Sequence, residues 1–304
     1  MAEAAEGATR CGFIALIGAP NAGKSTLLNA LIGSKVAIVT PKVQTTRALL
    51  RGIAIAGASQ LVFIDTPGIF RPRRRLDRAM VTTAWGGARE ADIAAVLIDS
   101  TKGLDEEAAA ILDQLGAISQ PKVLILNKVD AAEKPKLLTL AQAANARAKF
   151  ETTFMISALT GDGVADVKTW FAAHVPQGPW HFPADEISDA PERQLAAEIT
   201  REKLYLQLHQ ELPYQSTVET DKWEERKDGS VRIEQTIYVE RESQRKIVLG
   251  KGGGTIKAIG SAARKDIAEA IGQNVHLFLF VKVRENWGDD PERYRHMGLE
   301  FPKD

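Results

Sequence analysis

The stretch GFIALIGAPNAGKST, residues 12–26, decides how the first half of the chain folds. Its apolar beginning is typical of a buried strand, and glycines, a lysine and two hydroxyl residues follow directly. Gly18, Gly23, Lys24 and Ser25 fulfil the pattern G-x-x-x-x-G-K-S. Glycines let backbone N–H groups turn towards a phosphate, and the start of the following helix adds positive partial charge. The stretch therefore predicts a phosphate-binding loop between a strand and a helix.

The residues around this loop alternate between short apolar runs and helical segments, which predicts a mostly parallel sheet with helices on both faces. Strands are expected at 12–18, 49–56, 60–66, 93–99, 122–128 and 151–157, and helices near 24–33, 75–90, 105–116, 135–149 and 163–174. Only three residues separate the second and third strands, so these two are expected to form an antiparallel hairpin at one edge. Ligands of such sheets bind at the carboxyl ends of the strands.

Residues of this loop and of two later segments are expected to form a site for a nucleotide and Mg²⁺. Lys24 would reach the β- and γ-phosphates, and Ser25 would hold the metal ion. DTPG, residues 65–68, places Asp65 where a carboxylate linked to Mg²⁺ belongs and Gly68 where its N–H can meet the γ-phosphate. A hydroxyl from residues 40–48 must also meet Mg²⁺, and Thr46 is the first choice, with Thr45 as the alternative.

The motif NKVD, residues 127–130, predicts that the base is guanine. A carboxylate at Asp130 can accept hydrogen bonds from both N1–H and N2–H₂ of guanine, a donor pair that adenine lacks. Asn127 is expected to tie this loop to the phosphate loop, and the stem of Lys128 to cover the base. Ser157 and Ala158, in ISA at the end of the last strand, are expected to contact the guanine through backbone and packing.

Composition sets the class of protein. The chain has 304 residues, of which 44% are hydrophobic and 26% charged, with zero formal net charge, so overall charge gives no reason to expect nucleic acid or a membrane as partner. The one cysteine, Cys11, excludes an internal disulfide and fits a reducing cytoplasm. No apolar stretch reaches the roughly 20 residues of a membrane span. Residues 174–193 contain four prolines and no helical or strand periodicity, which indicates a connection between domains. The expected organisation is a flexible tail at 1–10, a first domain at 11–176, a linker at 177–190 and a second domain at 191–304.

The second half is expected to run helix, strand, strand, helix, helix, strand, with a helix from about 191 that Asp189 caps. GKGG, residues 250–253, lies between the last two helices. Residues 241–265 hold seven lysines and arginines and one acidic residue, so positive charge is concentrated around this loop. A G-x-x-G loop between two helices can clamp a nucleic-acid backbone, whereas the alternative is a flexible turn. Residues expected to contact single-stranded RNA are Arg245, Lys246, Gly250, Lys251, Gly252, Gly253 and Lys257.

These stretches, in this order, resemble the Era family of GTPases over about residues 10–300, with FPADEISD (182–189), REKL (201–204), ELPY (211–214) and HLFLFVKVRENW (276–287) adding to the likeness. The resemblance implies an α/β P-loop GTPase domain followed by an α+β type II KH domain. It implies GTP or GDP and Mg²⁺ as ligands, and action in small (30S) ribosomal subunit assembly at the 3′ end of 16S rRNA. It also implies a cytoplasmic location, with contact at the inner membrane face for many members. The chain is expected to be a monomer.

The resemblance further implies a K⁺ ion held by Asn21 beside the phosphates; stabilisation of the loop turn is the alternative role of this residue. The expected catalytic residues are Asn21, Lys24, Thr46 and Gly68. The expected nucleotide contacts are Gly18, Ala19, Pro20, Asn21, Ala22, Gly23, Lys24, Ser25, Thr26, Asp65, Thr66, Pro67, Gly68, Asn127, Lys128, Asp130, Ser157 and Ala158. The expected metal ligands are Ser25, Thr46 and Asp65.

Ile69 stands where Ras-like GTPases carry a glutamine that orients the attacking water, so a slow intrinsic rate of GTP hydrolysis is expected.

Three interpretations of the chain's function remain open. The chain is a GTPase switch that couples nucleotide state to RNA binding, an RNA-binding assembly factor that only senses GTP or GDP, or a membrane-associated cell-cycle GTPase. The run RPRRR, residues 71–75, is interpreted as a solvated segment, with an RNA or activating-protein contact as the alternative.

Overall fold

The structure is a computed structural model that describes residues 9–209, 212–285, 287, 290, 291, 294 and 297–301. Most of the predicted tail, residues 1–8, lies outside the described residues, and the first strand already begins at Arg10. The chain divides into two compact units. Unit 1 comprises 1–34 and 46–189, and unit 2 comprises 35–45 and 190–304. No helix in the described part of the chain is long and apolar enough to cross a bilayer.

Unit 1 is built on a six-stranded sheet in the order β2-β3-β1-β4-β5-β6. The strands are β1 (Arg10–Gly18), β2 (Leu50–Ala56), β3 (Ser59–Asp65), β4 (Ile93–Asp99), β5 (Lys122–Asn127) and β6 (Thr152–Met155). All neighbours pair in parallel except β2 and β3, which confirms the predicted antiparallel hairpin at one edge. The fold class is therefore the expected α/β arrangement.

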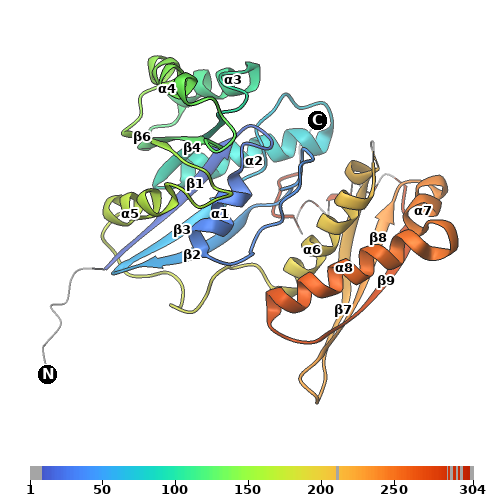
Figure 1. The fold of residues 1–304 in the computed structure, drawn as a ribbon. Helices are drawn as coiled ribbons and strands as arrows, with labels where there is room; N and C mark the ends of the chain where they lie inside the picture. Colours follow the sequence, from blue (N-terminus) through green and yellow to red (C-terminus); the bar gives the residue numbers. More distant parts are fainter. Residues whose placement is uncertain are drawn as a thin grey trace, which may run out of the picture. The chain divides into compact units, whose positions relative to one another are not determined.

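Helices cover both faces of this sheet, as Figure 1 shows. They are α1 (Lys24–Ile32), α2 (Arg75–Glu90), α3 (Glu106–Gln114), α4 (Lys134–Arg147) and α5 (Val164–His174). Helices α1 and α5 pack on each other and on β2 and β3, whereas α2 packs on β1 and β4 and α3 packs on α4. Burial on both faces explains why β3 and β4 are buried along their whole length rather than alternating.

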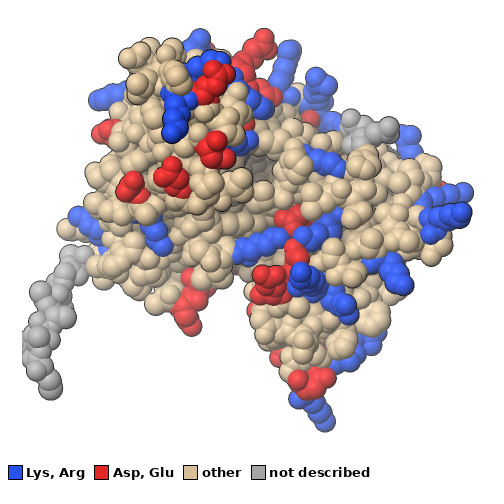
Figure 2. All heavy atoms as spheres, viewed as in Figure 1, with Lys and Arg blue, Asp and Glu red and all other residues tan. Residues whose placement is uncertain are grey.

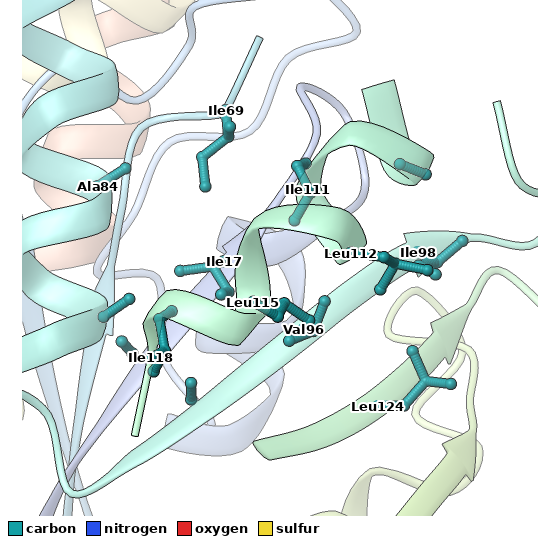
Figure 3. Close-up of a cluster of buried hydrophobic side chains, with 14 of the residues drawn as sticks. Ile17, Ile69, Ala84, Val96, Ile98, Ile111, Leu112, Leu115, Ile118 and Leu124 are labelled. Atoms are coloured by element: carbon teal, nitrogen blue, oxygen red, sulfur yellow. The ribbon is translucent and has the colours of Figure 1, made fainter. Parts of the chain in front are cut away.

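A hydrophobic cluster under α2 and α3 fixes the segment that follows β3 (Figure 3). Ile69 is 5% exposed and lies in this cluster with Ala84 of α2 and Ile111 of α3. The Ile69 side chain is therefore part of the core, and its apolar packing anchors the segment of residues 67–69.

The segment predicted as a linker packs within unit 1 over residues 177–189. Gly178 N–H donates to Thr9 O at 3.0 Å, and Gln60 Oε1 accepts from the N–H groups of His181 and Phe182 at 2.8 and 3.0 Å. The prediction that Asp189 caps the next helix is wrong. Its carboxylate pairs with Arg51 at 2.9 Å, and Pro191 occupies the N-cap position.

The elements described in unit 2 between Glu192 and Val283 follow the predicted order, with helices packed on a three-stranded sheet. They are α6 (Glu192–Gln207), β7 (Ser216–Glu225), β8 (Val231–Val239), α7 (Glu242–Leu249), α8 (Gly254–Ile271) and β9 (Val275–Val283). Strand β8 pairs antiparallel with β7 and parallel with β9. The inward-facing residues of β8, among them Ile233 and Ile237, are fully buried against the helices.

Unit 2 also contains residues 35–45, which follow α1 in the sequence. Ile38 is 3% exposed and lies in the same hydrophobic cluster as Ile199 of α6 and Ile233 of β8. The predicted boundaries assigned this segment to the first domain. Its sequence, KVAIVTPKVQT, has no helical or strand periodicity that would have revealed which unit buries Ile38.

Candidate functional site

The predicted nucleotide residues lie at or just beyond the carboxyl ends of β1, β3, β5 and β6, and those after β1 extend into the first turn of α1. The loop after β1 ends at Gly23, which has φ 96° and precedes α1. A Cβ at Gly23 would stand 2.2 Å from Nδ2 of Asn127, so this position needs glycine for both its backbone angle and its space. Asn21, at φ 63°, has the left-handed backbone that asparagine tolerates better than most residues.

Lys24, at the start of α1, is buried, and its Nζ donates to the carbonyl oxygens of Gly18 and Ala19, both at 3.1 Å. Burial lowers the pKa of Lys24 to about 8, and the negative charge of Asp65 opposes this effect. Among the described residues, the hydrogen-bond acceptors of this buried ammonium are two neutral carbonyl groups, and Asp65 supplies negative charge without accepting a hydrogen bond from the ammonium. Its surroundings therefore suit an anion such as a phosphate.

Three oxygen-bearing side chains meet beside Lys24. Ser25 Oγ lies 2.6 Å from Asp65 Oδ2 and 3.0 Å from Thr46 Oγ1, and Thr46 Oγ1 donates to Asp65 Oδ2 at 3.2 Å. Asp65 Oδ1 is buried, and no group among the described residues donates a hydrogen bond to it. Burial raises the pKa of Asp65, whereas the charge of Lys24 and the two hydroxyls lower it. An all-oxygen set with one unsatisfied carboxylate oxygen fits the ligand preference of Mg²⁺.

The structure distinguishes the two threonines. The hydroxyl of Thr45 lies 2.6 Å from Thr40 Oγ1 and donates to Lys42 O at 2.7 Å. Only Thr46 lies beside Ser25 and Asp65. The geometry therefore favours Thr46, the first choice from the sequence.

The predicted base-binding loop is tied to the phosphate loop by Asn127, as expected. Asn127 is 1% exposed; its Nδ2 donates to Ala22 O and its Oδ1 accepts from the N–H of Ala158, both at 2.9 Å. The buried Ser157 orders the same corner by accepting from Thr160 N–H at 3.1 Å. Asp130 lies in the turn after β5 and is exposed, so its carboxylate is accessible to a base.

Sequence reasoning missed Asp99, at the end of β4. Its Oδ2 accepts from Lys128 Nζ at 2.6 Å, and Thr101 donates to its other oxygen through both N–H and hydroxyl. Burial would raise the pKa of Asp99, but the hydrogen bonds from Lys128 and Thr101 outweigh it and hold the pKa below its usual range. A carboxylate at the carboxyl end of a buried strand was the available signal. Asp99 orients Lys128, whose backbone has φ 65°.

The segment after β3 begins with Thr66, which is buried and donates its hydroxyl to Leu16 O at 2.7 Å. Next come Pro67 and Gly68. A Cβ at Gly68 would stand 2.9 Å from the backbone of Pro20, so this glycine permits a close approach to the phosphate loop. Ile69 then donates its N–H to Gly18 O at 3.0 Å while its side chain enters the core cluster. An apolar, buried side chain cannot orient a water molecule.

In unit 2, the predicted G-x-x-G loop joins α7 to α8. Gly250, Gly252 and Gly253 have φ of 74°, 60° and 76°, and the last of these is the N-cap of α8. Lys246, Lys251 and Lys257 are exposed around the loop. In Figure 2, Lys and Arg side chains are visible at the end of unit 2 where α7 lies. This combination of backbone and charge suits a nucleic-acid backbone.

Arg245 differs from the lysines around the loop. Its Nε donates to Val281 O at 3.2 Å, and its guanidinium pairs with Glu242 at 2.9 Å. A phosphate would have to compete with both partners, so Arg245 contributes more to the packing of α7 on β9 than its sequence position indicated.

Two family models match the chain. One, described as a 50S ribosome-binding GTPase, matches residues 13–128, and one described as a KH domain matches residues 211–288. The GTPase Era of Bradyrhizobium sp. (strain ORS 278) is 68% identical, covering 99% of this chain and 98% of the relative. The GTPase Era of Brucella suis biovar 1 is 69% identical, covering 97% of this chain and 94% of the relative.

Two solved structures are also similar, each 34% identical with a TM-score of 0.90 over 95% of this chain and 99% of the other. One is Era in complex with MgGDPNP and nucleotides 1506–1542 of 16S ribosomal RNA. The other is an Aquifex aeolicus Era variant bound to GDP and AlF₄⁻. Identity near 70% along nearly the full length shows the family, and the chain belongs to the Era family of GTPases.

Proposed function

We propose that this chain couples GTP binding and hydrolysis in unit 1 to the binding of single-stranded RNA by unit 2, in assembly of the 30S ribosomal subunit. The observation that carries the proposal is the presence, in one chain, of the Ser25–Thr46–Asp65 oxygen cluster and an exposed G-x-x-G loop flanked by lysines. The similar Era structure in complex with nucleotides 1506–1542 of 16S rRNA supports the 3′ end of this RNA as the partner.

The nucleotide roles follow from the geometry. Lys24 would turn from the carbonyls of Gly18 and Ala19 to the β- and γ-phosphates, and Gly68 would offer its N–H to the γ-phosphate. Ser25, Thr46 and Asp65 would hold Mg²⁺, which neutralises charge on the phosphates when it is bound. Asp130 would accept the guanine donor pair, and the side chain of Lys128 would cover the base.

Thr46→Ala is expected to raise the Mg²⁺ concentration for half-maximal GTP hydrolysis by roughly tenfold, since it removes one oxygen ligand. GDP affinity should stay within about twofold, because the phosphate loop and Asp130 are intact. The measurement is a Mg²⁺ titration of phosphate release together with fluorescent GDP binding. Thr45→Ala is the matched control. An equal effect of the two variants would contradict the assignment of the metal contact to Thr46.

We propose that Asn21 helps to hold K⁺ beside the phosphates, where the positive charge would stabilise the transition state as an arginine finger does. The expected result is turnover at least roughly tenfold faster in K⁺ than in Na⁺ buffer, with loss of that difference in Asn21→Ala. Equal rates in the two buffers would leave Asn21 with the role of stabilising the loop.

A second candidate function is an RNA-binding assembly factor that senses GTP or GDP without using hydrolysis. The buried position of Ile69 favours this second function, because an apolar side chain in the core cannot position the attacking water. RNA affinity is the first test. Fluorescence anisotropy of a 3′-end RNA with GDPNP and with GDP should differ at least about fivefold if the units are coupled. Equal affinities would contradict both candidates.

The family resemblance supports a cytoplasmic location and, as the alternative function, peripheral contact with the inner membrane face. Flotation with liposomes that contain anionic lipid, compared with neutral liposomes, tests the second of these. Recovery that is equally low with both would remove the membrane interpretation.

A further inference from the structure

Residues 35–45 are a structural component of unit 2, although they come from the loop that leads to Thr46. Ile38 of this segment is buried in unit 2. In addition, Lys42 Nζ donates to the carbonyl oxygens of Tyr205 and Leu208, at the end of α6. Tyr205 donates its hydroxyl to Gln44 O at 3.5 Å. The segment is therefore held on α6 along its length rather than at one point.

Glu202 of α6 holds the first part of this segment with both carboxylate oxygens. Its side chain is 5% exposed; Oε2 accepts from Lys35 Nζ at 2.6 Å and Oε1 accepts from Val39 N–H at 2.9 Å. Lys203 and Asp266 close the network, because Lys203 Nζ pairs with both acids and Asp266 lies 3.4 Å from Lys35 Nζ. Charge-assisted hydrogen bonds to a buried carboxylate are among the stronger ones in proteins.

Arg201, the preceding residue of α6, holds the last residue of the segment. Its guanidinium is 2% exposed, donates from Nη2 to Thr45 O, pairs with Glu198 and lies over the Tyr205 ring at 5.2 Å. The Nη1 atom of Arg201 is buried with no hydrogen-bond partner among the described residues. Burying an incompletely paired guanidinium costs stability, and such a cost commonly marks a functional position.

Thr45 is joined by one peptide bond to Thr46, whose hydroxyl lies beside Ser25 and Asp65. We propose that Arg201 and Glu202 are positioning residues for GTP hydrolysis: by holding residues 35–45, they restrict where Thr46 can stand, so that its hydroxyl is available to Mg²⁺. The inference rests on the proposed function of Thr46. It makes two residues of the RNA-binding unit determinants of the metal requirement of the GTPase reaction.

The test is a Mg²⁺ titration of GTP hydrolysis by the full chain without RNA, comparing Arg201→Met, Arg201→Lys and Glu202→Gln with the wild type. Arg193→Met is the matched control, because Arg193 lies on the same helix and also donates to backbone carbonyls, those of Thr220 and Asp221 in β7. Fluorescent GDP binding is measured on every variant, since GDP binding does not need the threonine.

For Arg201→Met the half-saturating Mg²⁺ concentration should rise roughly tenfold, the equivalent of one charged hydrogen bond, while kcat at saturating Mg²⁺ stays near the wild-type value. The shift for Arg201→Lys should be intermediate, because lysine keeps the positive charge but replaces the guanidinium with a single ammonium group. Glu202→Gln should shift the same way, and GDP affinity should stay within about twofold in all variants.

Three results would overturn the inference. They are an unchanged Mg²⁺ requirement in both Arg201→Met and Glu202→Gln, an equal shift in Arg193→Met, and a loss of GDP affinity that parallels the Mg²⁺ shift. A wild-type chain that binds GDP but does not hydrolyse GTP would instead overturn the proposed function, and this inference with it.

Discussion

Asp130→Asn is expected to weaken GDP binding by at least roughly a hundredfold, because the amide can no longer accept two hydrogen bonds from N1–H and N2–H₂ of guanine. The asparagine oxygen could still accept from one guanine donor, but its NH₂ would face the other donor and leave it without a hydrogen bond to the protein. The same NH₂ can donate to the 2-oxo group of xanthine, so XDP should bind the variant better than GDP. The measurement is competition of GDP and XDP against a fluorescent nucleotide.

From the structure, Asp130→Asn is expected to alter base recognition without disturbing the surrounding loop. Asp130 is exposed, whereas the neighbouring loop is held by Asn127 through Ala22 and Ala158, so removing one charge leaves the scaffold in place. Asp162→Asn is the matched control, as an exposed aspartate in the loop that follows β6. Wild-type GDP affinity in Asp130→Asn, with no gain for XDP, would remove Asp130 from base recognition.

Gly253→Asp is expected to weaken binding of a short single-stranded RNA by roughly a hundredfold. The new carboxylate would lie in the loop where the RNA phosphates approach the backbone, and it would add repulsion where lysines now supply attraction. GDP binding in unit 1 should not change. Fluorescence anisotropy with labelled RNA at a stated salt concentration measures the loss.

The control for this variant comes from the other end of the same helix. Gly253 has φ 76° and Gly272 has φ 69°, and a Cβ at either position would meet nothing within 4 Å. Gly272→Asp therefore introduces the same charge and the same backbone strain away from the loop. If both variants lose RNA binding equally, the effect is on the stability of α8 and not on RNA contact.

Much of unit 1 could be predicted because its information is local. A parallel strand buried on both faces is a nearly continuous apolar run, as β4 is up to Asp99, and GAPNAGKST after a strand predicts a phosphate-binding loop followed by a helix. The short connection between β2 and β3 allowed only a hairpin. The motif spacing then placed Asp65 and Asn127 at one edge of the sheet, where the structure has them.

The errors concern contacts between distant parts of the chain. Asp189 has the residue type and spacing of an N-cap, but its carboxylate pairs with Arg51 of β2, a partner that no local pattern reveals. Asp99 was missed because its role depends on Lys128, which directly follows the neighbouring strand β5. The burial of Ile38 in unit 2 and the contact of Arg201 with Thr45 join residues more than 150 positions apart, so neither periodicity nor turn chemistry could indicate them.

The central claim is that RNA bound at the G-x-x-G loop controls GTP hydrolysis in unit 1. Single-turnover hydrolysis in K⁺ buffer, with and without a short single-stranded RNA matching the 3′ tail of small-subunit rRNA, tests it most directly in the wild type and in Gly253→Asp. RNA is expected to speed hydrolysis by the wild type and to leave the variant at its basal rate. Equal rates with and without RNA, at RNA concentrations that saturate the wild type, would contradict it.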